Sequence, residues 1–496
     1  MSSTFFKPKA VRGSLVGLAS IAACLAAQAA VTFEIASRDG PGVGFNDPTV
    51  VAPVGGNPKI TLGEQRQFVY QYVAGIWGAA LTSAQKVTVN AAWQALTCTA
   101  GSAVLGSASA WNGWRDFPNA PKTGTWYHQA LANKLAAVGQ SLADFYGQPD
   151  DGSGYGNVDI VTQFNVNLGQ ATCLAGSPFY LGVDGSPPAG QINFVEVLLH
   201  ELAHGLGFSL FTTSSATGAQ FDGKPSIWEH FMADNSTGKK WVGMTDAERV
   251  ASTVNFRALG WDGSNTNAAV PLVLKPGATP VPRLVFGGPA AGSFAGRKVF
   301  GTAGFGAQLF NVSKDVMPVV DQVNGTGLAC TASLSAANAA AVNGRIALID
   351  RGACGFAVKT KTAQNAGAVG VIIANNVAGV IAMGGADPTI TIPALMISLA
   401  DANALKLKLA RRTRTSSGVV GMMTSTVTGG AYVGTDALNR ALLYTPNPRI
   451  GGSSVSHWDT IATPNLLMEP NINADLGIVL GAPKDLTLPL LQDLGW

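Results

Sequence analysis

Two stretches in the first half of the chain place apolar residues at three- and four-residue spacing, which is the pattern of an amphipathic helix. They are residues 65–81 and residues 193–206. Apolar and polar residues alternate over residues 86–91, and residues 160–164 read as another short strand. The first half of the chain therefore predicts a mixture of helices and strands.

The helix expected at residues 193–206 has signals at both ends. Asn193 can accept a hydrogen bond from a free backbone amide as the N-cap, and Glu196 stands at the capping-box position. Gly205 and Gly207 mark the end of the helix. This is the strongest helix prediction in the sequence.

The composition changes at a proline-dense stretch, residues 271–282, which indicates a domain boundary. Beyond it, the chain up to about residue 426 is rich in alanine, glycine and valine and predicts an α/β unit. The expected strands are residues 345–350 and 369–375, and the expected helices are residues 357–366 and 401–409. After Gly430 the pattern returns to short strands and turns.

The N-terminus has the three parts of a secretory signal peptide: a basic segment, a short apolar run and a cleavage site of small residues. They are Lys7, Lys9 and Arg12, residues 14–25, and Ala27, Gln28 and Ala29. We therefore expect residues 1–29 to be removed and the protein to be secreted, into the medium or the periplasm. The alternative is a lipid anchor on Cys24, because residues 21–24 also fit a lipobox.

The charge balance narrows the classes of partner. Only 12% of the 496 residues are charged, and the three cations of the signal account for the whole net charge of +3. The remainder carries 29 basic and 29 acidic residues, which gives no argument for a nucleic-acid partner. No later stretch has the 18 apolar residues that a transmembrane helix needs.

Export also places the four cysteines beyond Cys24 in an oxidising compartment, where two disulfides are the default expectation. Four cysteines allow three connectivities. Proximity in the sequence favours Cys98 with Cys173 and Cys330 with Cys354.

The helix at residues 193–206 contains the sequence HELAH, residues 200–204. Histidines four residues apart lie on one helical face and can bind one zinc ion, and a glutamate beside them can take a proton from water. Zinc lowers the pKa of a bound water and polarises a carbonyl group. We therefore predict His200 and His204 as zinc ligands and Glu201 as the general base.

A catalytic zinc ion usually has a third protein ligand. The metzincin pattern places a histidine three residues after its glycine, but Leu210 stands at that position here. The remaining histidines are His128, His230 and His457, and Glu229 is a further candidate. His128 has no recognisable partner in the sequence, whereas Glu229 and His230 are the rivals of His457.

Two segments together resemble leishmanolysin-type metallopeptidases of the metzincin class. HELAHGLGF, residues 200–208, is similar to their first motif, and SHW, residues 456–458, followed by Met468, is similar to their second. The resemblance implies an α+β fold with a mixed sheet and an active-site helix, with Met468 beneath one catalytic zinc ion. The zinc ligands that it implies are His200, His204 and His457.

The segment between these motifs resembles a protease-associated (PA) domain. Residues 344–376 and IPALMIS, residues 392–398, match the strands, Arg-Gly turn and Ile-Pro pattern of that domain. The resemblance implies that an α/β PA domain, residues 282–426, interrupts a catalytic domain made of residues 30–281 and 427–496. The alternative is that this unit is one more layer of a single larger domain.

Three weaker features have structural explanations that we favour. Tyr444 could donate a hydrogen bond to an oxyanion, although a buried structural role is expected. The Asp/Gly-rich residues 150–154 could bind Ca²⁺, although a plain turn is favoured. The basic residues between Lys406 and Arg414 lie at the end of an expected helix and are interpreted as a solvated face.

Together these features predict a secreted zinc-dependent endopeptidase that cleaves protein or peptide substrates. One alternative is a secreted PA-domain binding protein whose zinc site is structural or inactive. The other is an exopeptidase.

Overall fold

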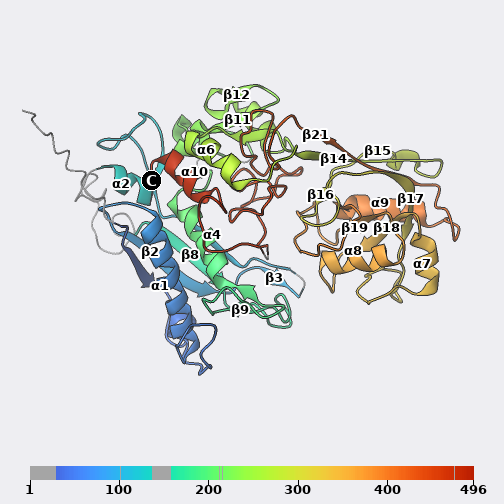
Figure 1. Cartoon of the computed structure of the whole chain (residues 1–496), viewed down its shortest axis with the longest axis horizontal. Coiled ribbons are helices and arrows are strands. Elements are labelled where there is room, and N and C mark those ends of the chain that lie inside the picture. Colours follow the sequence, from blue (N-terminus) through green and yellow to red (C-terminus); the bar gives the residue numbers. More distant parts are fainter. Residues whose placement is uncertain (1–29, 101, 137–157, 212, 215, 474) are drawn as a thin grey trace, which may run out of the picture.

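The computed structural model describes residues 30–496, except for residues 101, 137–157, 212, 215 and 474. The expected signal peptide, Cys24 and the candidate calcium site at residues 150–154 lie outside the described residues. The described residues form a larger and a smaller part, which lie side by side along the longest axis in Figure 1. None of the described helices has the length and apolar character needed to span a bilayer.

A four-stranded mixed sheet is the scaffold of the larger part. Its strands, in spatial order, are β1 (Phe33–Ser37), β2 (Val87–Gln94), β8 (Ile160–Asn165) and β5 (Gly106–Ala110). The first three are parallel, and β5 is an antiparallel strand at the edge.

Two helices pack near this sheet, α1 (Leu62–Ala80) and α4 (Phe194–Leu206). The helix α1 begins three residues earlier than predicted, because Thr61 and Glu64 form a capping box at its start. A Cβ atom at Gly205 would lie 2.3 Å from Cγ2 of Ile160, so this glycine lets α4 approach β8 closely. The HELAH motif is therefore carried by a helix held tightly against the sheet.

The predicted elements of the first half are confirmed, with boundaries shifted by a few residues. Asn193 caps α4 as predicted, by accepting a hydrogen bond from the amide of Val195. The capping-box role predicted for Glu196 is wrong, because its carboxylate hydrogen-bonds with the Asn193 side chain instead. The other elements of the larger part are β3 (Cys98–Thr99), β4 (Ser102–Ala103), β6 (Gly113–Trp114), β7 (Tyr127–His128), α2 (Gln129–Ala136), β9 (Phe179–Tyr180), β10 (Ile192–Asn193), β11 (Met232–Asp234), β12 (Lys239–Lys240), α5 (Asp246–Ser252), β13 (Leu259–Trp261), α6 (Ser264–Val273) and α10 (Thr487–Leu494).

Two expectations about the second half need correction. Pro271, taken as the start of a boundary segment, lies inside α6, where the helix continues to Val273. The chain after Gly430 ends in a helix, α10, whose residues Leu490, Leu491 and Leu494 are buried in the core. Short apolar runs do not separate a buried helix from a strand by periodicity, which explains the second error.

The smaller part is built on an eight-stranded sheet. In spatial order its strands are β15 (Gly296–Arg297), β14 (Pro280–Gly287), β21 (Val420–Val427), β17 (Asn311–Pro318), β18 (Ile346–Asp350), β19 (Gly370–Ala374), β20 (Ala394–Ile397) and β16 (Gly301–Thr302). The helices are α7 (Ala336–Val342), α8 (Phe356–Asn365) and α9 (Leu399–Leu409). Alternate residues of β18 face two separate cores, one shared with α7 and α8 and the other with α9.

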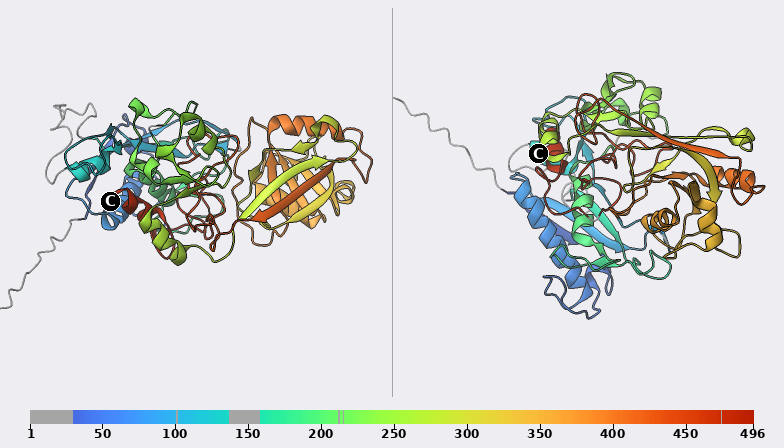
Figure 2. Two further views of the ribbon diagram at one scale, coloured as in Figure 1. Left: turned by 90° about the horizontal axis from the view of Figure 1, so that it is seen from above. Right: turned by 45° about the vertical axis from the view of Figure 1, so that its right-hand side comes forward.

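The chain enters and leaves the smaller part through neighbouring strands. β14 and β21 pair antiparallel along their whole length, from Pro280 opposite Val427 to Gly287 opposite Val420, and Figure 2 shows them side by side. The core cluster around α4 takes buried residues from Val31 to Leu274 and again from Ala441 to Leu494, and none from between. The segments before and after the smaller part therefore share one core.

Both predicted disulfides are present, Cys98 with Cys173 and Cys330 with Cys354. The first joins the hairpin of β3 and β4 to the loop after β8. The second lies within the smaller part.

Candidate metal centre

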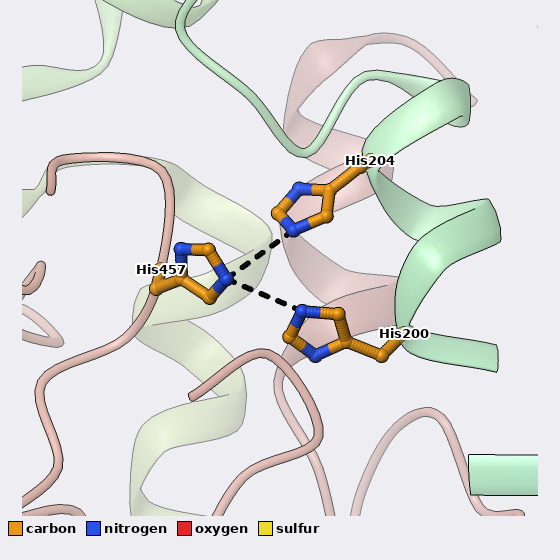
Figure 3. Close-up of side chains that lie close together, drawn as sticks. All are labelled: His200, His204 and His457. Atoms are coloured by element: carbon orange, nitrogen blue, oxygen red, sulfur yellow. Dashed lines mark hydrogen bonds between the residues drawn. The ribbon is translucent and has the colours of Figure 1, made fainter. Parts of the chain in front are cut away.

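Three histidines from distant parts of the sequence converge on one point (Figure 3). His200 and His204 come from α4, and His457 comes from the loop region after β21. The Nε2 atom of His457 lies 3.2 Å from Nε2 of His200 and 3.3 Å from Nε2 of His204. The structure thus brings together all three residues that the sequence predicts as zinc ligands.

Backbone carbonyl groups fix the orientation of each ring. The Nδ1 atoms of His200, His204 and His457 donate to the carbonyl oxygens of Leu467, Phe208 and Ser453, at 2.7, 2.7 and 2.9 Å. Because a carbonyl oxygen only accepts, each neutral ring carries its proton on Nδ1 and directs the lone pair of Nε2 at the common point.

This arrangement fits a zinc ion. Zinc–nitrogen bonds of about 2.1 Å at tetrahedral angles place two ligand nitrogens about 3.4 Å apart, close to the observed separations. Three lone pairs that face one another are also an unfavourable arrangement unless a cation lies between them. The donor set, three imidazoles with one coordination position left over, is that of a catalytic zinc site.

Burial keeps the three rings neutral, as metal ligation requires. It lowers the pKa of His200 to about 4 and that of His204 to about 3. Burial, together with the two neighbouring histidines, also lowers the pKa of His457 well below its usual range.

Glu201 follows His200 on α4 and reaches the edge strand of the sheet. Burial raises the pKa of its carboxyl group to about 8, against the lowering effect of a hydrogen bond from the backbone amide of Ala108 in β5. The hydrogen bond with Ala108 therefore joins the Glu201 carboxylate of α4 to the edge strand β5.

The loop after α4 holds the third histidine in place. Gly207 has a φ of 129°, which ends the helix and turns the chain so that the Phe208 carbonyl can accept from His204. Leu210 stands where metzincins have their third histidine, and its amide donates to the Ser456 hydroxyl group at 3.0 Å. Position 210 thus anchors the segment that supplies His457.

Met468 lies in a turn directly after Leu467, the residue whose carbonyl orients His200. It is fully buried, and its carbonyl accepts from the amide of Trp458 at 2.8 Å. The preceding carbonyl, that of Leu467, orients His200, and the Leu467 amide donates to the buried carboxylate of Asp485 at 2.6 Å. This turn therefore connects the two halves of the candidate site.

The smaller part of the chain contacts the segment that carries His457. The Tyr444 hydroxyl accepts a hydrogen bond from the amide of Ala382 and is buried there, so the structure gives this tyrosine a role between the two parts. Arg257, also buried, pairs with Asp459 at 3.1 Å and donates to the carbonyl of Pro280, where β14 begins.

The rival ligands are held elsewhere by their own partners. Glu229 caps the short helix Ile227–His230 and accepts hydrogen bonds from three side chains and one backbone amide. These donors belong to Thr213, Gln220 and Ser226. His230 contacts the Thr125 hydroxyl group, and His128 contacts that of Ser209 at 2.7 Å.

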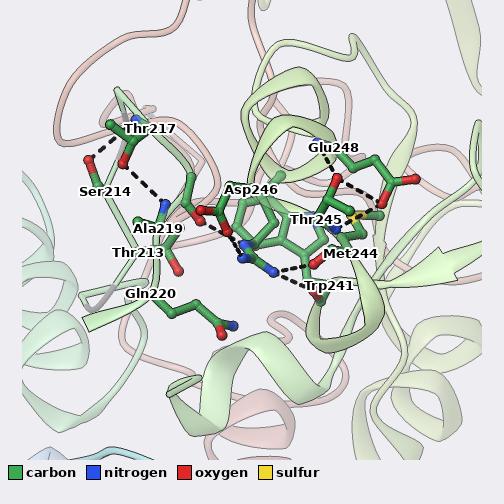
Figure 4. Close-up of polar contacts among 12 residues, drawn as sticks. Thr213, Ser214, Thr217, Ala219, Gln220, Trp241, Met244, Thr245, Asp246 and Glu248 are labelled. Carbon is green, nitrogen blue, oxygen red and sulfur yellow. Dashed lines mark hydrogen bonds and ion pairs between the residues drawn. The ribbon is translucent and has the colours of Figure 1, made fainter. Parts of the chain in front are cut away.

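Figure 4 shows how the loop that contains Thr213 and Gln220 lies beside the segment from Trp241 to Glu248. Arg249 joins the two by donating to the carbonyls of Gly218 and Met244. Glu229 and this arginine therefore hold the loop that follows α4 in place.

We expect Glu229→Ala to lower the melting temperature without loss of the metal. Removing one buried carboxylate leaves four donors unpaired, at a cost of about 3 kcal/mol or more, which corresponds to about 5 to 10 °C. Zinc content should stay unchanged, and Glu229→Gln should give a smaller decrease in melting temperature. Loss of zinc from Glu229→Gln at an unchanged melting temperature would instead identify Glu229 as a ligand.

The sequence did not predict the backbone groups that orient the three histidine rings. The carbonyls of Ser453 and Leu467 have no signature in the sequence, because any residue type provides the same oxygen. Gly207 was the one available signal, since a glycine after the motif allows the chain to turn back onto His204.

Comparison with known proteins identifies the smaller part. The PA domain family matches residues 316–405, so this chain contains a PA domain. No curated protein matches the chain.

Several solved structures show a slight likeness. One is an aminopeptidase from Aneurinibacillus sp. strain AM-1, with 18% identity over 41% of this chain and 42% of that chain and a TM-score of 0.22. Another is a zinc aminopeptidase from Bacillus subtilis, with 20% identity over 33% of this chain and 36% of that chain and a TM-score of 0.20. A third is a peptidase M28 precursor from Shewanella amazonensis, with 18% identity over 40% of this chain and 45% of that chain and a TM-score of 0.19. The match spans less than half the length of each of these proteins. At such TM-scores the likeness does not assign a fold to the part that carries the histidines.

Proposed function

We propose that this protein is an exported zinc endopeptidase of the metzincin class, similar to the leishmanolysin branch, with a PA domain inserted in its catalytic domain. The observation that carries the proposal is the convergence of His200, His204 and His457, each with its proton on Nδ1. Glu201 follows His200 directly on the same helix. The HELAHGLGF and SHW motifs that resemble that branch meet at this point. The shared core around α4 and the pairing of β14 with β21 support the insertion.

The three histidines would hold one zinc ion, which supplies an acidified water and polarises the scissile carbonyl. A bound zinc ion would lower the pKa of the Glu201 carboxyl group from the value of about 8 that burial gives it. The ionised carboxylate takes the proton of the attacking water and then delivers it to the leaving amine. The Ala108 amide orients this carboxylate from the edge strand. A structural zinc site has no use for a base at this position, which favours an enzyme over a binding protein.

The edge strand β5 supports internal cleavage. One edge of β5 pairs with β8. Within the described residues no strand pairs with its other edge, which we call the outer side. The outer side presents the Ala108 amide next to Glu201. An extended substrate chain can add to such an edge through backbone hydrogen bonds on both sides of the scissile bond.

The test is a digest of peptides with and without blocked termini, read by mass spectrometry. We expect N-acetylated, C-amidated peptides to be cut internally, and a zinc chelator to stop the reaction. Cleavage of only the peptides with free termini, one residue at a time, would show an exopeptidase. Bound zinc without cleavage of any peptide or denatured protein would favour the binding protein.

A further inference from the structure

The charge of this chain is divided unequally between its two parts. Residues 280–427, from the start of β14 to the end of β21, contain 13 lysines and arginines, 5 aspartates and no glutamate. The rest of the chain after residue 29 contains 16 basic and 24 acidic residues. Although the formal net charge after residue 29 is zero, the PA part has a formal charge of +8 and the remainder has −8. Within the described residues no ion pair joins the two parts. The charge difference therefore does not hold the two parts together through ion pairs.

The positive charge gathers at the C-terminal end of α9 and in the turn after it. Five cations lie within nine residues: Lys406, Lys408, Arg411, Arg412 and Arg414. Residues 410–416 are all exposed, and α9 lies on the PA part, remote from α4 (Figures 1 and 2). We call residues 406–414 the α9 basic end.

The carboxylates near the α9 basic end are already engaged. Asp350 pairs with Lys406, and Asp401 pairs with Lys298 at 3.3 Å. Asp315 accepts from the hydroxyl group of Ser416 and from the amide of Ser417. In the part of the chain that the structure describes, Lys408 and the three arginines form no ion pair, so their charge is directed at solvent.

Apolar side chains project among these cations. Leu407, between Lys406 and Lys408, is 76% exposed. Val323, in the loop at residues 320–325, is also fully exposed. This loop and α9 line one cavity of about 270 Å³, to which Val320, Gly325, Lys406 and Arg412 contribute. The exposed Val320 and the unpaired Arg412 thus line the same small hollow, which also includes the Lys406–Asp350 pair.

This combination selects among anionic partners. A cluster of four to eight lysines and arginines is attracted to anionic lipid headgroups by about 1 kcal/mol per residue near the surface. An apolar side chain set among the cations can enter the boundary between headgroups and acyl chains. A polyanion such as a nucleic acid offers the charge but no apolar phase for Leu407. The chemistry of the α9 basic end therefore favours an anionic lipid bilayer.

We propose that the α9 basic end and the loop at residues 320–325 form a docking surface for anionic lipid bilayers. The cations contact the headgroup phosphates, and Leu407 and Val323 enter the interface. Docking through the PA domain would hold the larger part of the chain near the membrane. The proposal concerns the PA domain and does not depend on the peptidase activity.

The experiment measures sedimentation of the chain from Ala30 onward with lipid vesicles at 0.1 M salt. We expect binding to vesicles of 30% phosphatidylglycerol in phosphatidylcholine and no binding to pure phosphatidylcholine. In the variant R411Q/R412Q/R414Q the affinity should fall by about a hundredfold, as expected for three lost contacts with anionic headgroups. Leu407→Ser should lower the binding that remains at 0.5 M salt, where the charges are screened.

The matched control is K59Q/K122Q/K224Q, which removes three exposed cations from the larger part and changes the net charge equally. We expect it to bind anionic vesicles within threefold of the unchanged protein. Equal losses in both triple variants would show a net-charge effect and overturn the proposal. Failure of the unchanged protein to bind anionic vesicles would also overturn it, and binding of DNA or polyglutamate in that case would assign the surface to a polyanion. Cleavage of a soluble peptide should be the same in all variants, so a failure here is distinct from a failure of the peptidase proposal.

Discussion

Replacing His457 with alanine is expected to abolish stoichiometric zinc binding and to reduce peptide cleavage to background. Two of the three converging Nε2 atoms would remain, and both come from one helix. A catalytic zinc site rests on three protein ligands, so the ion would be lost on dialysis. The measurement is zinc content per chain by elemental analysis, together with the cleavage rate.

His230→Ala is the matched control for this variant. His230 is the rival histidine, and the structure places it against Thr125, outside the cluster. This control should retain one zinc ion and full activity. The ligand assignment fails if His457→Ala keeps stoichiometric zinc and full cleavage, and the rival gains support if His230→Ala loses them.

Glu201→Gln is expected to keep the zinc ion and the fold while kcat/KM falls by about 10²- to 10⁴-fold, the range for loss of a general base. The amide oxygen of glutamine can still accept the hydrogen bond from Ala108, so the side chain should remain in place. It can no longer take up and return a proton. Steady-state kinetics and zinc content, measured on the same preparation, test both halves of the expectation.

Glu196→Gln provides the comparison on the same helix. Glu196 is also a glutamate of α4, but its side chain hydrogen-bonds with Asn193 at the start of the helix. We expect the rate of this variant to stay within about twofold of that of the unchanged enzyme. Unimpaired cleavage by Glu201→Gln, or an equal loss in both variants, would remove Glu201 from the role of base.

The sequence predicts those parts of the fold whose determinants are local. The helix α4 and the strands β18 and β19 were expected within one or two residues, because their apolar patterns and caps are continuous in the chain. The order of strands in the four-stranded sheet was not predictable, because β5 pairs with β8 across more than fifty residues. The helix α10 was missed, since its apolar residues are buried against a core formed by distant segments.

The candidate site divides in the same way. Spacing alone identified His200, Glu201 and His204, because a helix fixes the relative positions of residues four apart. His457 is 253 residues away from His204, and only the resemblance of its surroundings to a known motif distinguished it from His230. The bond between Leu210 and Ser456 that brings the two segments together has no sequence signal, because one of its groups is a backbone amide.

The pairing of β14 with β21 has a mechanical consequence. A domain carried on two separate flexible linkers can rotate freely, whereas a ladder of eight residue pairs resists both bending and twisting. At its base the amide of Thr428 donates to the carbonyl of Thr279, so the two chain segments next to the ladder are also joined. The PA domain is therefore held rigidly by this ladder. A surface at its far end would fix the angle at which the larger part faces the partner bound to that surface. The contact of Tyr444 with Ala382 adds to this attachment, so replacing the PA domain by a short hairpin turn would also remove a contact of the segment that carries His457.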